Sequence, residues 1–123
     1  MTKGQAIQKF WESFDLPAYD ATSVPDNAPL PYITYQVHTD SLDGLCMTNA
    51  SLWYKSYSWK EISEKTEQIS KAISQMYPPS VKIDGGRMYI TKGVPFAQRM
   101  SDTTSDDIRR MLLNVNFEFL TEY

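Results

Sequence analysis

The sequence predicts an α+β domain with a mostly antiparallel sheet of four to five strands and two helices packed on one face. Two segments carry apolar residues at helical spacing, several others alternate apolar and polar residues, and Pro, Gly and Asp separate them. The predicted order is helix, two strands, helix, three strands (α-β-β-α-β-β-β). A chain of 123 residues has the length of a single domain, which we expect to span residues 1–123.

The first predicted helix covers residues 3–14. Thr2 and Gln5 have the spacing of a capping box. An apolar stripe follows at helical spacing, made of Ile7, Phe10, Trp11 and Phe14. The helix is expected to end before Pro17, because proline disrupts a helix.

Residues 17–31 are predicted to form an extended loop, because prolines recur through the segment and disfavour a helix. A loop of this length in a compact domain often binds a partner. The candidate contact residues here are Pro25, Asp26, Asn27 and Pro29.

A hairpin with a wide connection is predicted next, with strands over residues 32–39 and 47–57. Residues 40–44 have the composition of a turn, and Leu42 and Asp43 are candidate contacts within it.

The second predicted helix begins at Trp59, with Ser58 and Glu61 as its capping box, and stops at Tyr77-Pro78-Pro79. Its apolar face is expected to consist of Ile62, Thr66, Ile69, Ile73 and Met76.

A second hairpin is predicted over residues 81–91, with its turn at 84–87. Residues 93–107 are predicted to be another loop, and the final strand covers residues 108–122. The candidate contact residues in this second loop are Phe96, Arg99 and Met100.

With both helices on one face, the other face of the sheet is expected to be partly polar and to meet solvent or a partner subunit. Strand alternation assigns it Thr34, Gln36, His38, Asn114 and Asn116.

Composition excludes several classes of function. The net charge is −3 and the twelve Lys and Arg residues are scattered, which disfavours a protein that holds nucleic acid tightly. Cys46 is the only cysteine, so an intrachain disulfide cannot form and a reducing compartment is expected. The sequence shows neither a secretory signal nor an apolar run of membrane-spanning length.

No catalytic, cofactor-binding or metal-binding residues are predicted, and we expect the chain not to be an enzyme. His38 is the only histidine and has no second ligand at metal-binding spacing. The acidic pairs Asp40 with Asp43 and Asp106 with Asp107 stand in turn-like segments, where Asp is common. Gly85-Gly86 joins two predicted strands, whereas a phosphate-binding loop leads into a helix.

The whole chain resembles a known group of proteins in size, element order and texture. A helix containing Phe10-Trp11 leads into a Pro-rich loop that ends LPYITYQV; LWYKSYSWKEISEKTEQISKAI, a Gly-Gly hairpin and SDDIRRMLLNVNFEFLTEY follow. In this it resembles the small tail-completion (head-tail joining) proteins of long-tailed bacteriophages and prophages, and within them the tail terminators.

The resemblance implies a structural role in virion assembly. Tail terminators form a hexameric ring on the finished tail tube, stop its polymerisation and present the surface that joins the DNA-filled head. The implied partners are further copies of the chain, the major tail tube protein and a head-completion or connector protein. DNA would pass through the ring without sequence-specific binding, and assembly would take place in the cytoplasm of the bacterial host, leaving the protein at the head-tail interface of the virion.

Two alternatives remain open. The nearer one is another head-tail connector, neck or minor tail protein, which sequence texture barely separates from a terminator. The more distant one is a stand-alone binding module or a small enzyme, which a defined pocket with a strongly shifted acidic group or His38 would favour.

Overall fold

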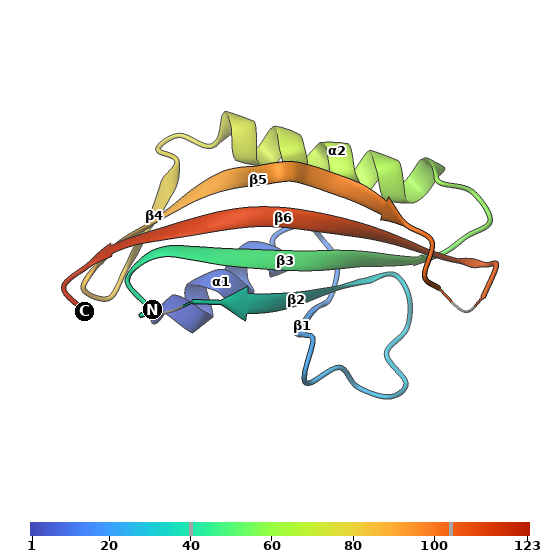
Figure 1. Ribbon diagram of the computed structural model, residues 1–123, viewed down its shortest axis with the longest axis horizontal. Coiled ribbons are helices and arrows are strands. Elements are labelled where there is room, and N and C mark those ends of the chain that lie inside the picture. Colours follow the sequence, from blue (N-terminus) through green and yellow to red (C-terminus); the bar gives the residue numbers. More distant parts are fainter. Residues whose placement is uncertain (40, 104) are drawn as a thin grey trace.

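The described residues of the computed structural model, 1–39, 41–103 and 105–123, form two helices and six strands (Figure 1). In chain order these are α1 (Lys3–Glu12), β1 (Ala18–Asp20), β2 (Tyr32–His38), β3 (Gly44–Lys55), α2 (Lys60–Gln75), β4 (Ser80–Ile83), β5 (Gly86–Met100) and β6 (Ile108–Thr121). The predicted α+β class and its two helices are confirmed. The predicted number of strands, four to five, is wrong.

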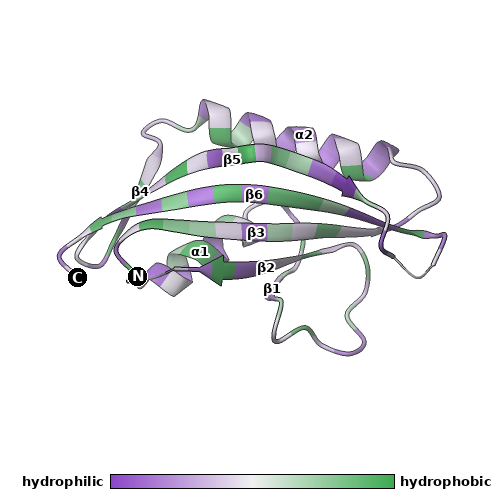
Figure 2. Cartoon of the chain, viewed as in Figure 1, coloured by the Kyte–Doolittle hydropathy of each residue, from purple (hydrophilic) through white to green (hydrophobic). Residues whose placement is uncertain are grey.

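All six strands belong to one sheet, with the spatial order β1-β2-β3-β6-β5-β4. The pair β1–β2 is parallel, and the other four pairs are antiparallel. Along β6, hydrophobic and hydrophilic residues alternate, so one side of this central strand is apolar (Figure 2). The sheet is therefore mixed, and the expected mostly antiparallel arrangement holds outside its first edge.

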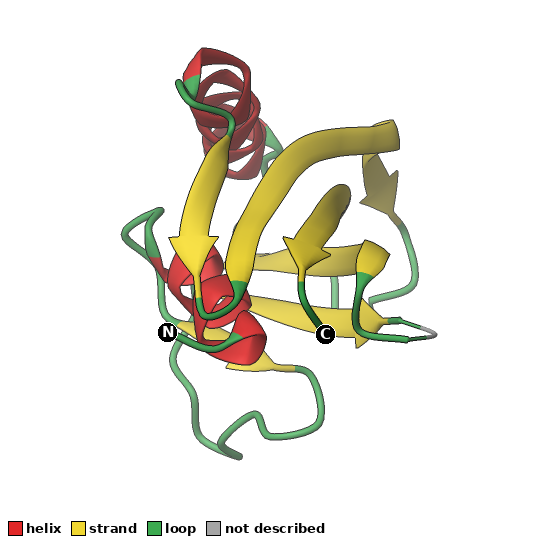
Figure 3. Ribbon diagram, turned by 90° about the vertical axis from the view of Figure 1, so that its left-hand side faces the viewer, coloured by secondary structure: helices red, strands yellow, loops and turns green. Residues whose placement is uncertain are grey.

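Both helices cover the same face of the curved sheet, as predicted (Figure 3). Helix α1 contacts β1 and β4, the strands at the two opposite edges, so the sheet must curve around it. Helix α2 packs on β3, β5 and β6. The helix-covered side is therefore the concave face, and the convex face carries no helix among the residues described.

Helix α1 begins as the sequence predicted. The Thr2 side chain accepts a hydrogen bond from the Gln5 N–H, and the Gln5 side chain accepts one from the Thr2 N–H. Phe10 and Trp11 are buried, and Phe14 lies beyond the helix end but is also buried. The aromatic stripe thus continues past the last helical residue.

Helix α2 begins differently from the prediction. Trp59 is the N-cap residue, and no side chain provides a cap hydrogen bond, so the predicted capping box of Ser58 and Glu61 is wrong. The Ser58 hydroxyl instead accepts a hydrogen bond from the N–H of Lys60, two residues on. The predicted apolar face is confirmed: Ile62, Thr66, Ile69 and Ile73 are buried, and Met76 packs against the core.

Strand β1 was missed because residues 17–31 were predicted to be loop throughout. Ala18–Asp20 pairs with residues 33–35 of β2. The remainder, from residue 21 to residue 31, is a long connection without helix or strand. A strand of three residues carries too short a pattern to be recognised, and its partner strand defines it.

The predicted loop over residues 93–107 is also wrong in its first half. Strand β5 continues to Met100 through an irregularity between Lys92 and Ala97, after which pairing with β6 resumes. A side chain at Gly93 would lie 2.8 Å from Asn114 Cβ, so glycine permits the close approach there. The Gly93 and Pro95 that suggested a loop instead mark a bulge in a long strand.

The two predicted hairpin turns agree with the structure to different degrees. Gly85 has a φ of +80°, and β4 and β5 join through the predicted tight turn. Strand β3 begins earlier than predicted, at Gly44. Asp40, part of the other predicted turn and of one acidic pair, lies outside the described residues.

Lys3 is a buried cation at one end of the molecule. Its Nζ donates hydrogen bonds to the carbonyl oxygens of Leu42 and Tyr123 and lies 5.3 Å from the centre of the Phe119 ring. These contacts join α1 to the β2–β3 connection and to the segment after β6. Neither described helix is long and apolar enough to cross a membrane.

Candidate functional site

The convex face of the sheet carries the polar side chains that strand alternation assigned to it. Register places Gln36 opposite Asn49, and Asn49 opposite Asn114. His38 lies opposite Met47, which in turn faces Asn116. The expectation of one partly polar face is confirmed, because these positions all have the parity opposite to the buried core residues of the same strands.

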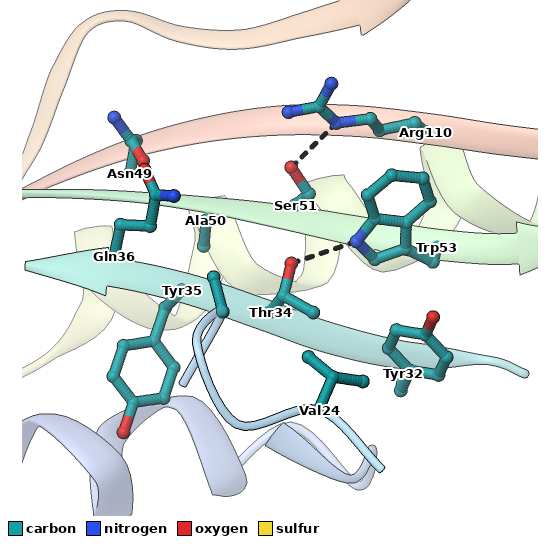
Figure 4. Close-up of a pocket in the computed structure, with 11 residues that line it drawn as sticks. Val24, Tyr32, Thr34, Tyr35, Gln36, Asn49, Ala50, Ser51, Trp53 and Arg110 are labelled. Atoms are coloured by element: carbon teal, nitrogen blue, oxygen red, sulfur yellow. Dashed lines mark hydrogen bonds between the residues drawn. The ribbon is translucent and has the colours of Figure 1, made fainter. Parts of the chain in front are cut away.

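A pocket of about 300 Å³ is hollowed into this face (Figure 4). Its floor comes from β2, β3 and β6, and Ala21 and Val24 of the connection after β1 line its side. Trp53 Nε1 donates a hydrogen bond to Thr34 Oγ1 at 2.9 Å, which fixes the orientation of the indole on the floor. The Gln36 and Asn49 amides stand at the opposite end from this indole.

Arg110 holds the β6 side of the pocket. Its guanidinium lies 5.1 Å from the centre of the Trp53 ring, and its Nε donates a hydrogen bond to Ser51 Oγ at 2.9 Å. It also forms an ion pair with Asp102. Because neighbours already occupy these donors, Arg110 stiffens the pocket wall and is poorly placed to attract a ligand by charge.

The four candidate contacts of the Pro-rich segment project from the domain. Pro25, Asp26, Asn27 and Pro29 are all exposed. In Figure 1 this connection extends away from the sheet between β1 and β2. It offers an accessible surface beside the convex pocket.

Asp20 anchors the start of this connection. Its carboxylate accepts hydrogen bonds from the Thr22 hydroxyl and the Thr22 N–H. These two bonds hold the pKa of Asp20 below its usual value, and the bond from the Thr22 hydroxyl has the larger effect. The loop therefore leaves the sheet through a local, charge-assisted turn.

Leu42 and Asp43 lie at a different place, in the connection between β2 and β3. Both are exposed, and Leu42 adopts a φ of +63°. The Asp43 carboxylate accepts a hydrogen bond from the Ser41 hydroxyl, and the Leu42 carbonyl accepts one from Lys3. Their side chains remain accessible while their backbone is held.

Phe96, Arg99 and Met100 belong to β5 and not to a loop. Phe96 is half-buried against the core with Lys92 Nζ 5.8 Å from its ring centre, so it serves packing. Arg99 is exposed, and its guanidinium lies 5.0 Å from the Trp59 ring centre of α2. Met100 pairs with Arg110 on β6. The nine candidate residues therefore lie in three separate places.

The described residues offer little support for a nucleophilic or a metal-binding site. Cys46 is fully buried, and burial raises the pKa of its thiol, which favours the neutral form. His38 is exposed, and its Nε2 lies 3.5 Å from the Asn49 amide nitrogen. The described residues contain no group of three or more His, Cys, Asp or Glu side chains placed to hold a metal ion.

The convex face also carries an apolar patch that was not predicted from the sequence, which we call the convex patch: Leu45, Met47 and Leu120. These side chains are 60%, 59% and 56% exposed, respectively. Their alternation with buried Cys46 and Phe119 was the available signal, because residues two apart in a strand share a face. Large exposed apolar side chains gathered on one face are typical of interaction sites.

The concave side has an apolar pocket of about 270 Å³ that was not predicted from the sequence either, which we call the socket. It opens where α1 approaches the end of α2 and the β4–β5 hairpin. Its walls are lined mainly by Met1, Ala6, Phe10, Met76, Val81 and Met88. No local pattern predicts it, because each wall comes from a different part of the chain.

Comparison with solved structures yields a likeness in fold. No protein-family model and no curated protein matches the chain. A chain in a solved structure titled "Virion of native gene transfer agent (GTA) particle" is similar, with a TM-score of 0.52 and 15% sequence identity. The match covers 90% of this chain and 81% of that chain. The two chains therefore share a fold over nearly the whole of this domain.

Proposed function

We propose that this chain is a structural protein of a tailed phage or phage-like particle, and more specifically a tail terminator that forms a hexameric ring on the tail tube. The observation that carries the proposal is the fold shared with a chain of the gene transfer agent virion. That likeness extends over most of both chains, so it concerns the whole domain and not one common motif. The resemblance of the whole sequence to tail terminators supports the same proposal.

The surface of the domain suits a component that touches several neighbours. The convex face bears no helix among the described residues, and the Pro25–Pro29 segment projects beside it. The convex patch and the socket add two apolar surfaces. A net charge of −3 would let DNA pass through a ring without being held, since like charges repel.

A head-tail connector or neck protein is the competing function, because the likeness is to a chain of a whole virion and the printed title assigns that chain no place in the tail. The two roles differ in what they bind. A terminator binds the end of a tail tube, whereas a connector binds the portal side of a head.

The test uses tail tubes polymerised from the major tail protein of the same particle. Adding the purified protein during polymerisation is expected to shorten the tubes and to place density at one end in negative-stain electron microscopy. Tubes that grow equally long, together with binding to purified heads, would replace the terminator by a connector. Binding to neither would remove the virion proposal.

A further inference from the structure

Two apolar surfaces lie on opposite sides of the same end of the domain. The convex patch lies near the start of β3 and the end of β6, and the socket lies on the concave side between α1 and the β4–β5 hairpin. Figure 3 views the molecule from this end, with the helices on one side of the sheet. We propose that the convex patch of one copy docks into the socket of a second copy, an inference that rests on the proposed ring and names its interface.

The patch has the form of a protrusion. Leu45 lies directly opposite Glu118 in the β3–β6 register, and Met47 lies two residues further along the same face. Leu120 stands two residues beyond Glu118 on β6. Three apolar side chains thus lie beside one carboxylate along β3 and β6, and all four are exposed.

The socket has the form of a receptor for such side chains. Three of its lining residues are Met1, Met76 and Met88, whose unbranched side chains adapt to an incoming apolar group. Its volume of about 270 Å³ falls just below the range of ~300–1,000 Å³ usual for small-molecule sites. A pocket of this size suits one or two side chains of a partner better than a cofactor.

Charge complementarity selects the second copy as the occupant. Lys9 lines the socket and is exposed, and Glu118 is exposed within the convex patch. Among the described residues, neither takes part in an ion pair within its own chain. Docking would bring Glu118 of one copy to Lys9 of the next, whereas patch-to-patch contact would oppose two glutamates.

The positions of the two surfaces determine the kind of assembly. Because patch and socket lie on opposite sides, each contact uses the patch of one copy and the socket of another and leaves one of each free. Such a head-to-tail contact closes into a ring if the rotation between copies allows, and otherwise extends as a filament.

The first experiment measures the mass of the purified chain by sedimentation equilibrium from about 1 μM to about 1 mM, with no tail tubes present. We expect reversible association. Leu45→Asp should weaken it by at least about tenfold, because it removes an apolar side chain from the contact and places a second carboxylate beside Glu118. Val94→Asp, at a side chain that is 98% exposed in the β5 bulge, is the matched control and should leave association unchanged.

The decisive experiment is a charge exchange. Lys9→Glu and Glu118→Lys should each weaken self-association by about three- to tenfold, because each opposes like charges at every contact. A 1:1 mixture of the two variants should associate again, since every mixed contact pairs a lysine with a glutamate. Both side chains are exposed, so the variants are expected to fold, which circular dichroism and the melting temperature verify.

Several outcomes would overturn this inference. They are a monomer at all concentrations, association that Leu45→Asp leaves intact, or a mixture that stays as weak as its components. Association only with a lipid vesicle or another virion protein would overturn it as well. A monomeric chain that still caps tail tubes would reject the interface and keep the proposed function, whereas self-association without capping would do the reverse.

Discussion

The Phe10 ring in α1 meets the Phe117 ring in β6 edge-on, with 5.3 Å between their centres and an angle of 82° between their planes. Phe117 is fully buried, and β6 is bonded to strands on both sides. Phe10 also contacts the rings of Trp11 and Phe14. This pair therefore links an aromatic cluster on the first helix to the centre of the sheet.

We predict that the Phe10–Phe117 contact contributes more than its buried area alone. Phe10→Leu and Phe117→Leu should each lower the free energy of unfolding by about 1–3 kcal/mol. In a double-mutant cycle, the stability lost by the double variant should be smaller than the sum of the two single losses. The difference should be about 0.5–1.5 kcal/mol, the value of an edge-to-face pair. Urea denaturation of the four proteins gives this coupling, and strictly additive losses would show that the rings pack independently.

Two glycines are predicted to respond in opposite ways to alanine. A Cβ at Gly86 would lie 1.9 Å from the Leu120 carbonyl oxygen, so Gly86→Ala must displace β5 from β6 and should cost about 3 kcal/mol or more. A Cβ at Gly4 in α1 would meet nothing within 4 Å. Gly4→Ala should therefore raise stability by about 0.5 kcal/mol through helix propensity. Thermal unfolding compares them, and equal effects would contradict the close approach at Gly86.

Asp20 is predicted to make folding stability depend on pH at the acidic end. Its pKa is lowered in the folded chain by the hydrogen bonds from Thr22, so the ionised form stabilises the fold at any pH above the usual pKa of an aspartate. This contribution is lost as the pH falls through the folded-state pKa. The effect is small because the side chain is exposed and screened by solvent.

The matched variant is Asp20→Asn, which keeps an acceptor but does not titrate. At neutral pH it should melt below the parent chain, and the difference should narrow as the pH falls through the folded-state pKa of Asp20, where the parent carboxyl becomes neutral like the asparagine amide. A difference in melting temperature that stays constant across this range would exclude a contribution from ionised Asp20.

Lys3 is predicted to stabilise the fold through its buried ammonium group. Lys3→Met keeps the length of the side chain but removes the hydrogen bonds to the Leu42 and Tyr123 carbonyls, which should cost about 1.5–3 kcal/mol. Lys71→Met, at an exposed position of α2, serves as control and should change stability by less than about 0.5 kcal/mol. Chemical denaturation measures both. A Lys3→Met variant as stable as the parent chain would show that this side chain stabilises the fold by packing alone.

The two helices and strands β3 and β6 were predictable because their patterns are local. The stripe containing Phe10 and Trp11 and the alternation along residues 108–122 each identify an element without knowledge of its neighbours. The second face of the sheet followed from the same alternation. These predictions needed only the residue spacing within one segment.

The remaining features depend on contacts between distant segments. Residues 18–20 become a strand because β2 lies beside them, and residues 93–100 become one because β6 continues past the bulge that Gly93 and Pro95 make possible. Phe96 was therefore assigned to a loop although it packs against the core. The socket is set by the approach of α1, α2 and β4, which no single segment encodes.

Strand β6 follows the other five described strands in the chain, yet it occupies the middle of the sheet. Before β6 is present, β1-β2-β3 and β4-β5 share no hydrogen-bonded strand pair in the described sheet, and β3 and β5 each expose a long unpaired edge. Exposed edges of this kind invite pairing with other chains, and closing contacts between residues 44–55 and 108–121 is slow because they are far apart in sequence. A nascent chain that lacks β6 is therefore expected to be aggregation-prone, and the insertion of β6 to be the step at which the two halves become one sheet.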